Sequence, residues 1–110
     1  MAETFKHPRD LYPFYNARYF RGRLPRIPVV FRPDKKMPKV IALTEFREGV
    51  PIKIAINSRY KKAKSIWYFY LLHEMVHVEQ RKLPRSQAHG HKFQRRMKQL
   101  ANLGAFNRFW

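Results

Sequence analysis

The spacing of apolar residues along the chain predicts three helices. The first is expected in the stretch DLYPFYNARYFRG, beginning at Asp10 and ending at Gly22, because Asp is a frequent N-cap and Gly a frequent C-terminal stop. From Ser65 the apolar positions again follow a helical period, and Pro84 sets a limit to this second helix. A third helix is predicted over residues 91–103, where apolar residues recur on one side of a strongly basic segment.

Between the first two helices the pattern changes to that of short strands. The segments IPVVF at 27–31 and VIALTEF at 40–46 are rich in β-branched and aromatic residues, and IKIAIN at 52–57 alternates large apolar residues with smaller or polar ones. Three strands that follow one helix and precede two others indicate an α+β fold with a small three-stranded sheet.

Composition limits what such a chain can be. With 110 residues, of which 45% are hydrophobic and 15% aromatic, residues 1–110 are expected to form a single domain with its own core. The absence of cysteine excludes a disulfide framework and a thiol nucleophile, so a bound metal must be held by His and carboxylate side chains. The polar opening MAETFKHPRD and the short apolar run at 66–72 indicate a soluble, cytoplasmic protein without a membrane segment.

A metal-binding pattern lies inside the second predicted helix. In the stretch WYFYLLHEMVHVEQ, His73 and His77 are four residues apart, so both imidazoles can face one ion. Glu74 is rotated away from that direction but can reach a water bound to the ion, which suits a general base. Zinc is the metal that fits best, because neutral imidazole nitrogens suit it and a catalytic zinc keeps three protein ligands and one water.

The third ligand has to come from elsewhere in the chain. Glu79 is two residues beyond His77 and faces away from it, so it is expected to pair with a nearby basic residue. His7 lies in a polar segment with no helper residue nearby. The remaining candidates are His89 and His91 in the segment QAHGHKF, and spacing alone leaves both open.

Three segments together resemble the SprT-like metallopeptidase domain, the family that includes the Spartan proteases. They are YNARYFRGRLPRIPVVF near the start, LLHEMVHVEQ in the middle and HGHKFQRRM near the end, so the resemblance covers nearly the whole chain. The opening motif N-x-x-[YF]-F-x-G-x-L-P is matched by Asn16, Phe20, Gly22, Leu24 and Pro25. The signature H-E-[ML]-[IVA]-H is matched by residues 73–77. The motif H-G-x-x-[FW] is matched by His89, Gly90 and Phe93.

The resemblance implies a zincin-like α+β fold: an N-terminal helix, a small three-stranded sheet over the active-site helix, and a C-terminal helix. It implies one zinc ion per chain, held by His73, His77 and His89, and an endopeptidase in which Glu74 takes a proton from the metal-bound water. In well-known members such a domain cleaves proteins at DNA, as in the repair of DNA–protein crosslinks. Many members also carry a Cys-rich zinc ribbon, which this chain lacks.

The formal net charge of +17 favours a polyanionic partner, with DNA the preferred candidate. The protein is accordingly expected to act as a monomer on protein substrates at nucleoid or host-cell DNA. The residues predicted to contact nucleic acid are Arg59, Lys61, Lys62, Lys64, Arg95, Arg96 and Lys98.

Two questions stay open at the level of sequence. A second group that stabilises the oxyanion is usual in such enzymes, and Tyr60, Arg85 and His91 are equal candidates. The alternating strand at 52–57 is expected to offer an edge to an extended substrate. The alternative function is a zinc-stabilised nucleic-acid-binding protein without proteolytic activity, in which His91 would fill the fourth position on the metal.

Overall fold

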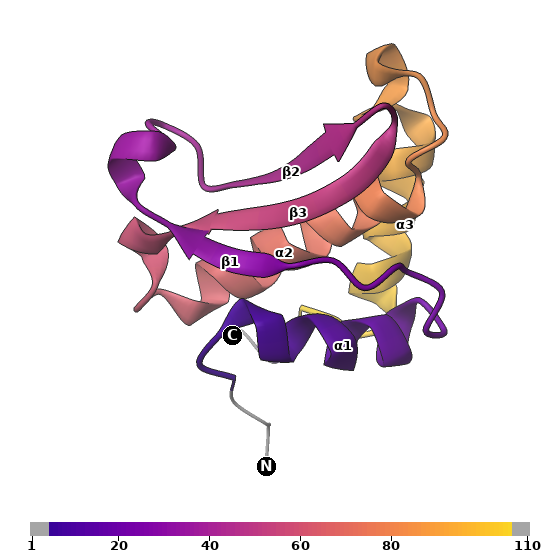
Figure 1. Cartoon of the computed structure of the whole chain (residues 1–110). Coiled ribbons are helices and arrows are strands. Elements are labelled where there is room, and N and C mark those ends of the chain that lie inside the picture. Colours follow the sequence, from indigo (N-terminus) through magenta and orange to yellow (C-terminus); the bar gives the residue numbers. More distant parts are fainter. Residues whose placement is uncertain (1–4, 107–110) are drawn as a thin grey trace.

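A computed structural model describes residues 5–106 and has the predicted α+β organisation (Figure 1). In chain order the elements are α1 (Pro8–Tyr19), β1 (Val29–Arg32), the 3-10 helix η1 (Asp34–Lys36), β2 (Ala42–Arg47), β3 (Val50–Asn57), η2 (Ser58–Tyr60), α2 (Lys64–Glu79), η3 (Arg85–Gln87) and α3 (His91–Asn102). The three helices and three strands confirm the elements predicted from periodicity, with shifted boundaries.

The start of α1 differs from the prediction. His7, and not Asp10, is the N-cap, because its Nδ1 accepts a hydrogen bond of 3.0 Å from the backbone N–H of Arg9. Pro8 follows at the first helical position, where its missing N–H costs nothing. Asp10 lies in the first turn, where its negative charge interacts favourably with the positive end of the helix dipole.

The segment between α1 and β1 is held by Asn16. Its side-chain amide donates to the backbone carbonyl of Leu24 and its Oδ1 accepts from the Leu24 N–H, both at 3.1 Å. Tyr12 adds a hydrogen bond of 2.7 Å from its hydroxyl to the Pro25 carbonyl. Asn16, Leu24 and Pro25 of the opening motif therefore fix the path of the chain into β1.

The sheet has the strand order β1-β3-β2, with β1 parallel and β2 antiparallel to β3. The prediction that the strand at 52–57 offers a free edge is wrong, because β3 is the central strand and hydrogen-bonds on both sides. The large apolar residues of β3 still mark its inner face, since Ile54 and Ile56 are fully buried. The edge strand β2 lies next to α2.

Helix α2 is the centre of the molecule. It packs against β2 and β3 on one side and is contacted by α1 and α3 (Figure 1). Its buried apolar residues spread over a broad part of its circumference, which explains its low polarity: Trp67, Tyr68, Leu71, Leu72, Met75, Val76 and Val78. Within residues 5–106, no helix combines the length and apolarity that a membrane crossing requires.

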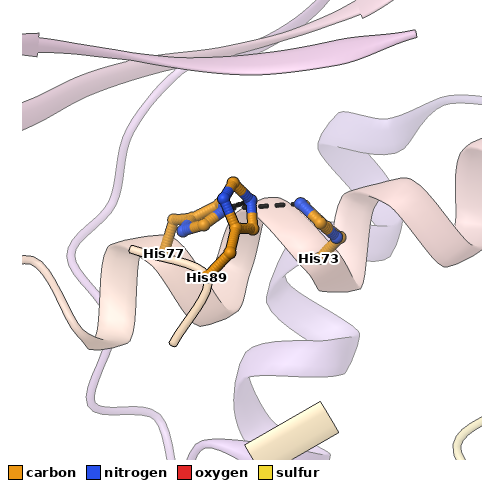
Figure 2. A group of neighbouring side chains, drawn as sticks. All are labelled: His73, His77 and His89. Carbon is orange, nitrogen blue, oxygen red and sulfur yellow. Dashed lines mark hydrogen bonds between the residues drawn. The ribbon is translucent and has the colours of Figure 1, made fainter. Parts of the chain in front are cut away.

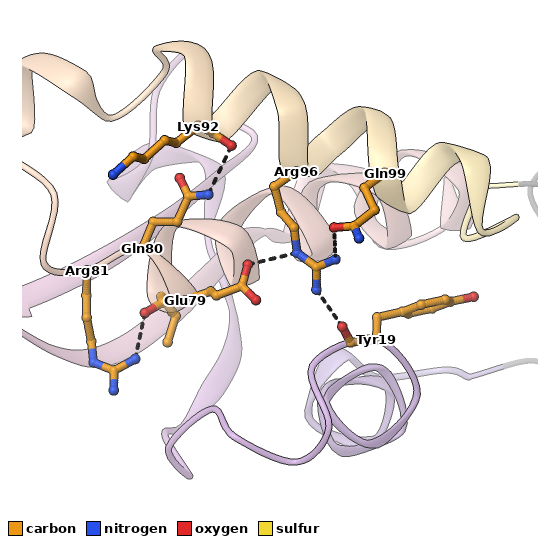
Figure 3. Close-up of polar contacts among 8 residues, drawn as sticks. Tyr19, Glu79, Gln80, Arg81, Lys92, Arg96 and Gln99 are labelled. Atoms are coloured by element: carbon orange, nitrogen blue, oxygen red, sulfur yellow. Dashed lines mark hydrogen bonds and ion pairs between the residues drawn. The ribbon is translucent and has the colours of Figure 1, made fainter.

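Arg96 ties the three helices together (Figure 3). Its Nε donates to Glu79 Oε1 of α2 at 2.9 Å, and its two Nη atoms donate to Gln99 Oε1 and to the Tyr19 carbonyl at the end of α1. Only 14% of its side chain is exposed. Arg96 therefore does not fit the predicted phosphate contact, whereas the expectation that Glu79 pairs with a basic residue is confirmed.

Candidate metal centre

Three histidine side chains converge beside α2 (Figure 2). His73 and His77 project from the same face of the helix, and their Nε2 atoms are 3.2 Å apart. His89 reaches them from the loop that precedes α3, and its Nε2 lies 3.1 Å from that of His77. The helical spacing thus brings the two α2 histidines together as predicted, and the chain returns to add His89.

This arrangement fits a bound metal ion better than a hydrogen-bonded cluster. One ligand nitrogen from each of the three histidines lies within 4.8 Å of the others. A tetrahedral zinc with Zn–N bonds of about 2.0–2.1 Å holds its ligand nitrogens about 3.3–3.4 Å apart, close to the separations seen here. The Nε2 of His77 faces two other Nε2 atoms and a single N–H cannot serve both, whereas lone pairs on all three can bind one cation.

Phe93 keeps the three imidazoles in place. Its buried ring stacks on His77, with centroids 4.7 Å apart and planes 18° apart, and meets His73 and His89 edge-on at 4.8 and 5.0 Å. Gly90 allows the backbone to turn closely past Gln87 before α3. A methyl group at this position would lie only 3.3 Å from the backbone oxygen of Gln87. The motif formed by His89, Gly90 and Phe93 therefore supplies one of the three imidazoles, a close turn and a support for all three rings.

Burial prepares the α2 histidines to bind a metal. It lowers the pKa of His73 to about 4, with further lowering by the neighbouring His77 and His89, and it lowers the pKa of His77 to about 4 with help from His89. Both imidazoles are therefore neutral near pH 7 and have a free lone pair for a metal ion.

Glu74 lies beside this centre in an unusual environment for a carboxylate. It is only 6% exposed, and burial raises its pKa to about 7, although a hydrogen bond from Thr44 opposes the rise. The Thr44 hydroxyl donates to Glu74 Oε1 at 2.7 Å, across from β2 to α2. A carboxyl with a pKa near neutrality can both accept and return a proton, which is the requirement for a general base.

A cleft of about 490 Å³ opens beside the three histidines and borders both this cluster and Glu74. It is lined by Glu74, His77 and His89, by Thr44, Phe46 and Gly49 of the β2–β3 hairpin, and by Gln80, Arg81, Leu83, Arg85 and Ala88 of the segment that returns to the metal centre. The cleft therefore has one wall from the edge strand and one from the loop that carries the third histidine.

The sequence model of the SprT-like family matches residues 9–108 of the chain. The chain belongs to the SprT-like family. Neither the curated proteins nor the solved structures contain a further match. Membership links the SprT-like chain to metallopeptidase-like domains, and its mixed sheet with three helices is consistent with a zincin-like fold.

The predicted site residues of this SprT-like domain fall into separate places. Among the three candidates for oxyanion stabilisation, Arg85 lines the cleft, whereas Tyr60 belongs to η2 and the exposed His91 begins α3. Thr44 escaped the sequence analysis, because a threonine within a β-rich segment has an ordinary explanation as a strand former.

The predicted nucleic-acid contacts are divided between two regions. One region runs from η2 to the start of α2 and contains Arg59, Lys61, Lys62 and Lys64, whereas Arg95 and Lys98 lie on α3. Lys64 is half-buried, and the other five side chains are exposed.

Proposed function

We propose that this protein is a zinc-dependent endopeptidase that acts on proteins at DNA. The observation that carries the peptidase assignment is the convergence of His73, His77 and His89 next to a buried carboxylate in an open cleft. Three imidazole ligands leave a fourth position for water or substrate, as catalytic zinc sites do and closed structural sites do not. In support, the exposed His91 is not among the residues that converge.

Zinc, when bound, supplies Lewis acidity, which lowers the pKa of a coordinated water and polarises a peptide carbonyl. Glu74 accepts the proton of the attacking water and then donates it to the amine that leaves. Its position supports this role, because the carboxyl is buried, borders the cleft with His77 and His89, and has a pKa near neutrality. Arg85, on the opposite wall, is the candidate to stabilise the oxyanion.

The substrate is proposed to bind as an extended strand along β2. This strand is at the sheet edge, pairs with β3 on one side only, and contributes Thr44 and Phe46 to the cleft. An added strand would be held mainly through backbone hydrogen bonds, so the side chains of the substrate matter little. Low sequence selectivity is expected.

DNA association is proposed from a basic surface at the end of the sheet away from the hairpin, which we call the lysine surface. It consists of the exposed residues Lys35, Lys36, Lys39, Arg59, Lys61 and Lys62. The buried Asn57 joins its two segments: the Asn57 amide contacts Asp34 Oδ1 at 2.7 Å and the carbonyls of Met37 and Val40, while its Oδ1 accepts from the Arg59 N–H. Such a clustered cationic surface suits a phosphate backbone.

The lysine surface and the metal centre are connected by α2. Nine residues separate Lys64, at the start of the helix, from His73, which corresponds to about 14 Å along the helix axis. A protein attached to DNA that is bound at the lysine surface would therefore be close to the cleft. The proposed substrate is therefore a polypeptide next to the bound nucleic acid.

The peptidase proposal is tested with Glu74→Gln, which keeps the shape of the side chain and removes the proton acceptor. Zinc-loaded wild type should cleave a basic DNA-bound protein, and Glu74→Gln should reduce this by a factor on the order of 10² to 10⁴ while zinc and DNA stay bound. Equal cleavage by both proteins would refute the assignment. Zinc and DNA binding without any cleavage by wild type would instead favour the nucleic-acid-binding alternative.

The DNA proposal is tested by reversing charge on two surfaces. Wild-type affinity for duplex DNA should fall with salt, with a log–log slope of about −0.9 per phosphate contact. The triple change combines Lys61→Glu and Lys62→Glu on the lysine surface with Lys64→Glu, directly after it at the start of α2. It should weaken binding to all sequences alike and flatten that slope. The charge-matched control reverses three exposed arginines of the segment between α1 and β1: Arg21, Arg23 and Arg26. Equal losses in both triples would overturn the location of the surface.

A further inference from the structure

Thr44 makes a single specific contact with the catalytic apparatus. Its hydroxyl oxygen lies 2.7 Å from Oε1 of Glu74, thirty residues further along the chain. We propose that Thr44 is a positioning residue, whose hydroxyl orients the Glu74 carboxylate so that its other oxygen, Oε2, exchanges the proton. This inference rests on the proposed peptidase function and adds a residue from the substrate-binding strand to it.

The direction of the hydrogen bond decides which carboxylate oxygen is free. An ionised carboxylate can only accept, so the Thr44 hydroxyl must be the donor. Within residues 5–106, no other hydrogen bond reaches the Glu74 carboxylate. The terminal torsion of a Glu side chain has a broad energy minimum, so without this bond either oxygen could face the cleft. The bond to Oε1 removes that freedom.

Thr44 is itself rigidly held. It lies in β2 opposite Ile54 of the central strand, on the face of the sheet that packs on α2. Its β-branched side chain has few accessible rotamers, so the sheet fixes the direction of the hydroxyl. Ile54 is fully buried, which anchors the register of the pair. The position of the carboxylate is therefore set by the sheet as well as by its own helix.

The location of Thr44 also links base and substrate. Thr44 and Glu74 both line the cleft, together with the ligands His77 and His89. Since β2 is the proposed platform for an extended substrate, this one strand would both hold the peptide and orient Glu74, the group that transfers the proton from water to the leaving amine. A residue acting in this way affects the rate of the chemical step more than the affinity for substrate.

A purely structural role predicts a different behaviour. In that case the hydroxyl would only satisfy a buried carboxylate, and its loss would lower stability without a selective effect on turnover. Two substitutions separate the roles. Thr44→Val keeps the shape and the β-branch but removes the hydroxyl, whereas Thr44→Ser keeps the hydroxyl and removes a methyl group.

The experiment compares zinc-loaded wild type, Thr44→Val and Thr44→Ser, as full chains, on a fluorescently labelled basic protein bound to duplex DNA. Zinc content is measured for each protein, and the unfolding temperature confirms that each is folded at the assay temperature. We expect kcat to fall by about 10- to 100-fold in Thr44→Val, with KM unchanged, as is usual when a partner of a catalytic group is lost. Thr44→Ser should stay within about threefold of wild type, because it keeps the hydroxyl donor.

Several results would overturn the proposal. They are wild-type kcat in Thr44→Val, equal losses in Thr44→Val and Thr44→Ser, or a rise in KM alone. If Thr44→Val does not fold, Thr44→Ala takes its place and the same comparison with Thr44→Ser decides. Absence of cleavage by zinc-loaded wild type is a separate outcome, which overturns the proposed function and this inference with it.

Discussion

Replacing Glu74 with Gln should stabilise the metal-free protein at alkaline pH. The carboxylate is buried, and among residues 5–106 no cationic side chain offsets its charge. Burial is the dominant cause of its raised pKa, and the Thr44 hydrogen bond opposes the rise only in part. Ionisation of Glu74 therefore lowers the free energy of unfolding of the metal-free protein. A neutral amide of the same shape avoids that cost, and its oxygen can still accept from Thr44.

The magnitude follows from the pKa. In the folded protein the pKa of Glu74 rises from 4.5 to about 7, and the ordinary value applies after unfolding. A raised pKa means that the stabilising contribution is complete below pH 4.5 and is lost as pH rises through 7. At about 1.4 kcal/mol per pH unit, the loss reaches about 3 kcal/mol at pH 8.5. Glu74→Gln should escape this loss, which corresponds to roughly 12–24 °C in Tm for a chain of this size.

The assay is urea unfolding in the presence of a chelator, followed by the fluorescence of the buried Trp67, at pH 4.5, 6 and 8.5. The gain from Glu74→Gln should be close to zero at pH 4.5 and grow with pH. Both proteins carry the same histidines, so the effects of these residues cancel in the difference. Exposed Glu48, changed to Gln, is the matched control and should alter stability little at any pH. A gain that is independent of pH would refute the reasoning, and saturating zinc should reduce the gain because a nearby cation stabilises the carboxylate.

Three further predictions concern the metal ligands and the helix junction. The protein should hold one zinc, and Ala at any of the three ligand histidines should remove it, whereas His91→Ala should keep it; full zinc retention by His89→Ala in elemental analysis would contradict the ligand set. Because the pKa of His73 is lowered from 6.5 to about 4, the stability that its neutral form contributes is present above pH 6.5 and lost as pH falls toward 4. Metal-free His73→Asn should therefore lose less stability than wild type over that range in urea titrations, and an identical loss would rule out this contribution. Arg96→Met should lower the unfolding free energy by about 1–3 kcal/mol, whereas the exposed Arg95→Met should change it by less than about 0.5 kcal/mol; similar effects of the two changes in thermal unfolding would argue against the helix junction.

The parts of this protein that could be predicted from sequence are those that depend on short spacings. His73 and His77 point the same way because four residues make about one helical turn, whatever surrounds the helix. The strands were found from alternation and β-branched residues, although their order was not. His89 was preferred over His91 through the resemblance of HGHKF to a family motif, and the convergence of three imidazoles agrees with that preference.

Boundaries and caps were less predictable, because residues compete for the same local role. Asp10 and His7 both offer an acceptor near the start of α1, and Pro8 at the first helical position favours the earlier start. Asn57 looked like the polar side of an alternating strand, yet it is buried and joins two loops through its amide. Such outcomes depend on which backbone groups lack partners once the chain has packed.

The contacts that complete the site belong to the tertiary structure. Thr44 meets Glu74 only because β2 adds to the outer edge of β3 and packs on α2, and Arg96 meets the end of α1 only because α3 crosses beside α2. Residues 30 or 77 positions apart have no spacing rule that relates them, since their approach is set by the joint packing of all the elements. Local periodicity places His73, Glu74 and His77 on one helix, whereas the approach of His89, the cleft and the contact of Glu74 with Thr44 arise when sheet and helices close around that helix.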